Sequence, residues 1–122
     1  MVYYFDIDGT ICTMSKNLNY EEAQPIKDRI HKVNELYNLG HTIIYWTARG
    51  TVTGKDWSDI TKKQFKTWGV KYHDLKFGKP FYDLFVDDRN INDKSFFKDW
   101  YENFNNRSIR LFGPTLNTKA RT

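Results

Sequence analysis

The sequence predicts an α/β protein built on a mainly parallel sheet. Runs of apolar, β-branched and aromatic residues alternate with segments of helical periodicity, in the order strand, helix, strand, helix, strand, strand, helix. This alternation is typical of parallel strands joined by crossover helices. The chain has 122 residues, the size of one domain with a single core. Polar residues follow three of the predicted strands, which places them at the edge where α/β sheets hold ligands.

The first half of the chain predicts two strands and one helix. Residues 2–7 form a short apolar run that suits a buried strand. Pro25 suits the first turn of a helix, and Gly40 stops that helix. Residues 41–46 are rich in β-branched and aromatic side chains and predict the second strand. The apolar face of the helix consists of Ile26, Ile30, Val33 and Tyr37.

The second half predicts one more helix, two strands and a final aromatic helix. Asp56 is a candidate helix cap, and Gly69 marks the end of that helix. Its apolar face is formed by Trp57, Ile60, Phe65 and Trp68. Residues 72–77 and 82–86 predict the third and fourth strands. The last helix would present Phe96, Phe97, Trp100, Tyr101 and Phe104 on one face.

Composition and cysteine content predict a cytoplasmic protein. Hydrophobic residues make up 39% of the chain and charged residues 28%, as in ordinary globular domains. No apolar run reaches the roughly 18 residues of a membrane-spanning helix, and the N-terminus lacks the pattern of a secretory signal. Cys12 is the single cysteine, so it cannot form an internal disulfide. We interpret it as a small packing residue rather than a reactive thiol.

The positive charge is concentrated at the C-terminus. The net charge is +4, and residues 107–122 carry four basic side chains and no acidic one. We therefore predict a catalytic domain at 1–106 and a basic tail at 107–122. The tail would suit contact with nucleic acid, an acidic partner or a second copy of the chain, but a solvated terminus is the favoured interpretation.

The pair of carboxylates at the end of the first strand is the most informative feature. Residues 6–10 read Asp-Ile-Asp-Gly-Thr. Because side chains alternate along a strand, Asp6 and Asp8 point the same way. Two carboxylates so close repel each other unless a divalent cation lies between them or one holds a proton. The sequence therefore predicts a metal site or a proton-transfer site.

Two further strand ends add groups that suit phosphoryl transfer. Thr47-Ala48-Arg49-Gly50 follows the second strand, and Asp87-Asp88-Arg89 follows the fourth, with Gly78-Lys79-Pro80 just before that strand. The carboxylates can hold Mg²⁺, while Thr47 and Lys79 can bind phosphoryl oxygens. One acid can attack phosphorus, and the other can exchange the proton of the leaving alcohol.

These four motifs, in this order, resemble those of haloacid dehalogenase superfamily phosphatases. The resemblance covers residues 6–88 and implies a three-layer Rossmann-like fold. It implies that Asp6 is the nucleophile and that Asp8 is the general acid and base. Thr47 and Lys79 would hold the phosphoryl group. Mg²⁺ would be bound by Asp6, Asp8 through its backbone carbonyl, Asp87 and Asp88.

The residues around the motifs are similar to those of small capless phosphatases of capsule and surface-carbohydrate biosynthesis. The segments 10–25 and 50–79 leave no room for a cap domain. An open site follows, with a sugar phosphate or related metabolite as the expected substrate. The candidate substrate-binding residues lie within or beside the motifs and are Gly9, Thr10, Ala48, Arg49 and Arg89. For Arg49, an anion grip and a structural ion pair are equally favoured.

The same residues are compatible with other functions. A nucleic-acid end phosphatase or nucleotidase would use the open site and the basic tail. A phosphotransferase would pass the phosphoryl group to an alcohol in place of water. A non-catalytic binding module would not need both a nucleophile and an acid. Aromatic residues at Tyr3, Phe81 and Trp100 would suit the surface of a homo-oligomer or, equally, the core. His73 is interpreted as structural.

Overall fold

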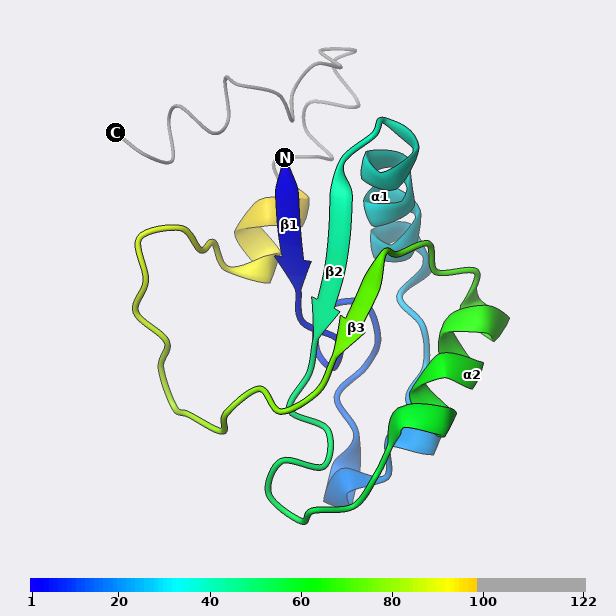
Figure 1. The fold of residues 1–122 in the computed structure, drawn as a ribbon, viewed down its shortest axis with the longest axis vertical. Coiled ribbons are helices and arrows are strands. Elements are labelled where there is room, and N and C mark those ends of the chain that lie inside the picture. The colour runs from blue at the N-terminus through cyan, green and yellow to red at the C-terminus, as the bar shows by residue number, and fades with distance from the viewer. Residues whose placement is uncertain (99–122) are drawn as a thin grey trace. The chain divides into compact units, whose positions relative to one another are not determined.

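The computed structural model describes residues 1–98 of the chain (Figure 1). The chain divides into two compact units. The first unit is Met1–Tyr82, and the second begins at Asp83. The predicted tail at 107–122 and the aromatic residues Trp100, Tyr101 and Phe104 lie outside the described residues.

The first unit contains a parallel three-stranded sheet. Its strands are β1 (Val2–Phe5), β2 (Thr42–Trp46) and β3 (Asp74–Lys76), in the spatial order β1-β2-β3. Val2 pairs with Thr42 and Ile44 pairs with Asp74, so all three strands run in one direction. Their carboxyl ends lie at one edge of the sheet (Figure 1). The predicted α/β class with a parallel sheet is confirmed.

Two helices link the strands, as the periodicity predicts. α1 (Lys27–Asn38) joins β1 to β2, and α2 (Ser58–Trp68) joins β2 to β3 (Figure 1). The Asp56 carboxylate accepts a hydrogen bond of 2.8 Å from the Ser58 backbone N–H, but Trp57, not the predicted Asp56, is the N-cap residue of α2. Gly69 ends α2 in the left-handed conformation that favours glycine.

The core of this unit lies on one face of β2. Ile43 and Tyr45 lie on the same face of the strand, because side chains alternate between its two faces, and both are fully buried. The Tyr45 ring packs edge-on against Phe65 of α2 with a centroid distance of 5.0 Å. α1 contributes Ile30, Val33 and Leu36 to the same core. This packing fixes α2 against the sheet and so positions the residues that follow β2.

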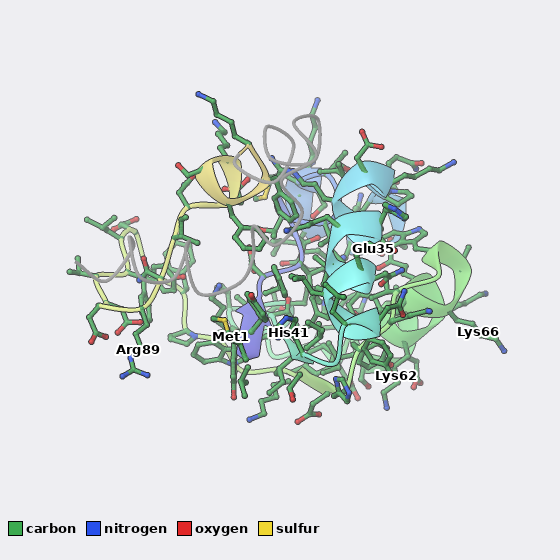
Figure 2. The ribbon with its side chains drawn as sticks, turned by 90° about the horizontal axis from the view of Figure 1, so that it is seen from above. Met1, Glu35, His41, Lys62, Lys66 and Arg89 are labelled. Carbon is green, nitrogen blue, oxygen red and sulfur yellow. The ribbon has the colours of Figure 1, made fainter. Side chains whose placement is uncertain are left out.

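The starts of β1 and β2 are also tied together. Met1 and His41 lie side by side in Figure 2, and the Met1 amino group is 2.9 Å from His41 Nδ1. Between β1 and α1 the chain makes two short 3-10 helices, η1 (Lys16–Leu18) and η2 (Tyr20–Glu22). No helix within residues 1–98 is long and apolar enough to cross a lipid bilayer.

The predicted fourth strand is wrong. Residues 82–86 have no strand conformation, and the side chains of Leu84 and Val86 are 79% and 87% exposed. An apolar β-prone run becomes a strand only where a neighbouring strand accepts its hydrogen bonds, which the run itself cannot supply. Residues 93–98 of the second unit are helical and bury Phe96 and Phe97, in agreement with the start of the predicted last helix.

A buried lysine on α1 predicts a pH-dependent stability. The Lys32 side chain is fully buried, and burial lowers the pKa of its amine to about 5. Between pH 5 and 10.5 the unfolded chain therefore binds a proton that the folded chain does not. Stability should rise with pH across this window, by up to about 1.4 kcal/mol per pH unit from this residue. Lys32→Met should remove this slope in urea unfolding at several pH values; an unchanged slope would contradict the assignment.

Candidate active site

The chain turns sharply where β1 ends. The Gly9 backbone N–H donates to the Cys12 carbonyl at 2.8 Å, and the Thr10 and Ile11 N–H groups donate to the Ile7 carbonyl at 3.0 and 2.9 Å. These bonds fold residues 7–12 into a compact turn beyond the carboxyl end of β1. Asp6 and Asp8 therefore stand at the edge that parallel sheets use for binding.

The structure brings Asp6 and Lys79 together. Lys79 Nζ lies 3.5 Å from Asp6 Oδ1, and the Thr10 hydroxyl donates to Asp6 Oδ2 at 3.4 Å. The Asp6 side chain is 39% exposed, so a ligand can reach it. Partial burial raises the pKa of the Asp6 carboxyl, and the positive charge of Lys79 opposes that rise. The Asp6 carboxylate and the Lys79 ammonium group thus lie together where solvent can reach the carboxylate.

Backbone hydrogen bonds join Thr47 to the Lys79 segment. The Lys79 N–H donates to the Thr47 carbonyl at 3.1 Å, and the Thr51 hydroxyl donates to the Lys79 carbonyl at 2.8 Å. The Thr47 side chain is buried, and its Oγ1 accepts the Arg49 N–H at 3.1 Å. The sequence-predicted residues Asp6, Thr10, Thr47 and Lys79 therefore belong to one connected group.

Asp8 is held by Arg49. Arg49 Nε donates to Asp8 Oδ2 and Arg49 Nη2 to Asp8 Oδ1, each at 2.9 Å. The Arg49 side chain is 0% exposed and that of Asp8 is 13% exposed. The structure therefore shows the ion-pair alternative for Arg49. Its use as a substrate contact stays a prediction.

Three residues that the sequence analysis missed hold the far side of the guanidinium. Arg49 Nη1 donates to Thr61 Oγ1 at 2.9 Å and to Gln64 Oε1 at 2.6 Å, both on α2. The Tyr20 ring lies against the same group, 4.9 Å from Arg49 Cζ to the ring centroid. We call Arg49, Thr61, Gln64 and Tyr20 the Arg49 clamp. Thr61 and Gln64 lie three residues apart and so share one face of α2, but this spacing alone does not point to Arg49.

Cys12 and His73 have structural contacts. The buried Cys12 thiol lies 3.4 Å from Asp8 Oδ1. Burial first, and then the Asp8 charge, raise the pKa of this thiol to about 12, which keeps it protonated at neutral pH. His73 Nδ1 accepts the Ile43 N–H at 3.1 Å, and its ring stacks on Tyr37. Neither group is placed as a nucleophile.

A shallow pocket of about 160 Å³ lies beside the Lys79 segment. It is lined by residues 49–51, 55–57 and 77–78. Lys55 Nζ lies 4.2 Å above the Trp57 ring, which places a cation at this pocket. Gly50 and Gly78 line it as well, and Ala48, a candidate substrate-binding residue, is partly exposed just before it in the chain.

The third group of predicted residues belongs to the second unit. Asp88 and Arg89 are 84% and 72% exposed and lie 4.0 Å apart, and Asp87 is exposed as well. In the first unit the Asp6 carboxylate is open to a cation, whereas both Asp8 oxygens contact Arg49. Within residues 1–98, no three acidic, histidine or cysteine side chains gather to hold a metal ion. The Asp6 carboxylate fits Mg²⁺ as one oxygen ligand, and the complete predicted set stays a prediction.

The loop after β2 depends on a glycine, which gives a stability prediction. Gly50 has φ +84°, and a Cβ there would collide with the Lys55 backbone carbonyl. Gly54 has φ +79°, but a Cβ there would meet open space. Gly50→Ala should lower the free energy of unfolding by about 2 kcal/mol or more, and Gly54→Ala by about 1 kcal/mol. Urea unfolding of both variants measures the difference; equal losses would contradict the tight loop geometry.

Comparisons with known proteins bear on the fold. A crystal structure of an MCSG target from Vibrio cholerae superposes with a TM-score of 0.71, over 78% of this chain and 85% of that one. The likeness is one of fold. The two sequences are 24% identical, and the neighbour's name states no function. No protein-family model matches the chain, and no curated protein matches it.

Proposed function

We propose that this protein is a Mg²⁺-dependent phosphomonoesterase that acts through an aspartyl-phosphate on Asp6. The observation that carries the proposal is the distance of 3.5 Å between Lys79 Nζ and Oδ1 of the partly exposed Asp6 carboxylate. The backbone hydrogen bond from Lys79 to the Thr47 carbonyl supports the proposal of Thr47 as a second phosphoryl-binding residue. A nucleophile beside fixed phosphate-binding groups is what phosphoryl transfer requires. This activity is the one that the resemblance to haloacid dehalogenase superfamily phosphatases implies.

The reaction would proceed in two displacements. In the first, an Asp6 carboxylate oxygen bonds to phosphorus while the bond to the ester oxygen breaks, and Asp8 gives a proton to the leaving alcohol. In the second, water attacks phosphorus, Asp8 takes back a proton, and the bond between Asp6 and phosphorus breaks. Lys79 would offset the charge of the phosphoryl oxygens in both steps.

The proposed Mg²⁺ ligands are the oxygen-bearing groups that the resemblance implies. Asp6, the Asp8 carbonyl, Asp87 and Asp88 would hold Mg²⁺, which prefers oxygen ligands. Bound there, the ion would supply charge neutralisation for the phosphoryl group. Arg89 is proposed as a substrate contact next to these acids. The partly open Asp6 carboxylate supports this assignment.

The proposed substrate is a phosphorylated sugar or related metabolite in the cytoplasm. The segment between β1 and α1 holds two 3-10 helices of three residues each, which supports a domain without a cap. The three-layer Rossmann-like arrangement is part of the proposal. Gly9 and Thr10 in the turn after β1, together with Ala48, would line the open site. An uncapped site would leave the leaving group in contact with water, which favours hydrolysis over transfer to another alcohol.

Phosphate release from a broad ester panel tests this proposal. The panel includes sugar phosphates, nucleotides and end-phosphorylated oligonucleotides, each with Mg²⁺ and with EDTA. We expect Mg²⁺-dependent release from small esters. Release from the oligonucleotides alone would favour the end-phosphatase alternative. No release from any ester would contradict the proposed activity and favour a binding module or a transferase.

A further inference from the structure

The two oxygens of the Asp8 carboxylate differ in how many polar groups contact them. A carboxylate has about four lone-pair positions, two on each oxygen. Asp8 Oδ1 accepts Arg49 Nη2 at 2.9 Å and contacts the Cys12 thiol at 3.4 Å. Asp8 Oδ2 accepts Arg49 Nε at 2.9 Å. Oδ1 therefore has two polar neighbours, whereas Oδ2 has one and is the less occupied oxygen.

We infer that Arg49 is a positioning residue, which holds Asp8 so that Oδ2 is the atom that exchanges a proton with the leaving group. This inference rests on the proposed function and deepens it. Two parallel hydrogen bonds from a guanidinium fix both the position and the plane of a carboxylate, which a single lysine ammonium cannot do. In this proposal Arg49 acts through Asp8 and not on the substrate, because its side chain is 0% exposed.

Two residues of α2 hold the Arg49 guanidinium in place. Thr61 Oγ1 and Gln64 Oε1 accept the remaining N–H groups on Nη1 at 2.9 and 2.6 Å. Gln64 Nε2 in turn donates to the Tyr20 carbonyl at 2.7 Å. The guanidinium is thus fixed from behind by a helix that packs on the sheet, and a helix supports a more exact geometry than a loop does. We therefore expect polar residues of α2 to influence proton transfer without contacting the substrate.

Leaving-group dependence distinguishes this role from a structural one. An alkoxide is a poor leaving group and needs a proton from Asp8, whereas 4-nitrophenolate leaves with little help. Arg49→Gln should lower kcat on an alkyl phosphate by about 100-fold or more, and affect kcat on 4-nitrophenyl phosphate far less. Arg49→Lys keeps the charge but loses the two-point contact, so it should recover only part of the alkyl activity.

Two further variants control for damage to the fold. Thr61→Val is nearly isosteric, removes one support of the guanidinium and should show a smaller loss with the same preference. It keeps the inference testable if Arg49→Gln does not fold. Phe65→Leu loosens the same helix at a buried position outside the clamp and should leave the ratio of alkyl to aryl turnover unchanged.

The outcomes separate this inference from the proposed function. Selective loss of alkyl turnover in Arg49→Gln and Thr61→Val would support the positioning role. Equal losses on both esters, or the same selectivity in Phe65→Leu, would overturn it while the phosphatase activity stands. A wild-type protein inactive on both esters would overturn the proposed function and this inference with it.

Discussion

Asp6→Asn should abolish phosphate release, with a loss on the order of 10⁴-fold or more, because the amide cannot form the covalent intermediate. Asn has the same shape as Asp and can still accept the Thr10 hydroxyl that lies 3.4 Å from Asp6 Oδ2. The variant should therefore fold. Burial raises the pKa of the Asp6 carboxyl, so the ionised group is disfavoured in the folded chain and its removal should not reduce stability at neutral pH.

Asp74→Asn is the matched control for this prediction. It makes the same chemical change at an exposed position on β3, away from the turn that follows β1. Turnover and urea unfolding should be measured for both variants with the substrate found in the ester panel. Substantial turnover by Asp6→Asn would contradict the role of Asp6 as nucleophile. A similar loss in Asp74→Asn would show that the effect is not specific to the site.

Lys79→Met should reduce kcat/KM by about 10²- to 10³-fold. The variant keeps most of the side-chain volume but removes the charge that lies 3.5 Å from Asp6 Oδ1. That charge would stabilise the phosphoryl oxygens as the transition state forms, a contribution of this size for a preorganised group. Because the same charge also offsets the burial of Asp6, its loss leaves that carboxylate without its cation. Steady-state kinetics of the variant measure the effect.

Lys76→Met is the corresponding control. The exposed Lys76 amine contacts the Tyr4 hydroxyl at 3.0 Å, and the residue lies on β3 only a short distance along the chain from Lys79. Its loss should change kcat/KM little. Equal losses of kcat/KM in the two variants would contradict a specific role for Lys79. A Lys79→Met variant with the kcat/KM of the wild-type protein would contradict it as well.

The fold of the first unit could be predicted because its signals are local. The spacing of Ile30 and Val33 defines α1, and Gly69 ends α2 as predicted. The approach of Lys79 to Asp6 agrees with the roles that the resemblance implies for them, although Lys79 follows β3 and does not precede a fourth strand within residues 1–98.

The Arg49 clamp could not be derived from the sequence because it depends on packing between distant elements. Tyr20, Arg49 and Gln64 come from η2, the loop after β2, and α2. Nothing local distinguishes an arginine that binds a substrate from one that is buried against Asp8. The predicted strand at 82–86 failed for the related reason that strand formation needs a partner.

Capture of the covalent intermediate tests the proposed role of Asp6 as the nucleophile. A single turnover of the wild-type protein with the best ester of the panel is stopped with acid, and the peptide that contains Asp6 is examined by mass spectrometry. We predict a hydroxylamine-sensitive phosphoryl group on Asp6 that is absent from Asp6→Asn. Rapid turnover with no phosphoryl group at Asp6, or with one on another residue, would contradict the proposed mechanism.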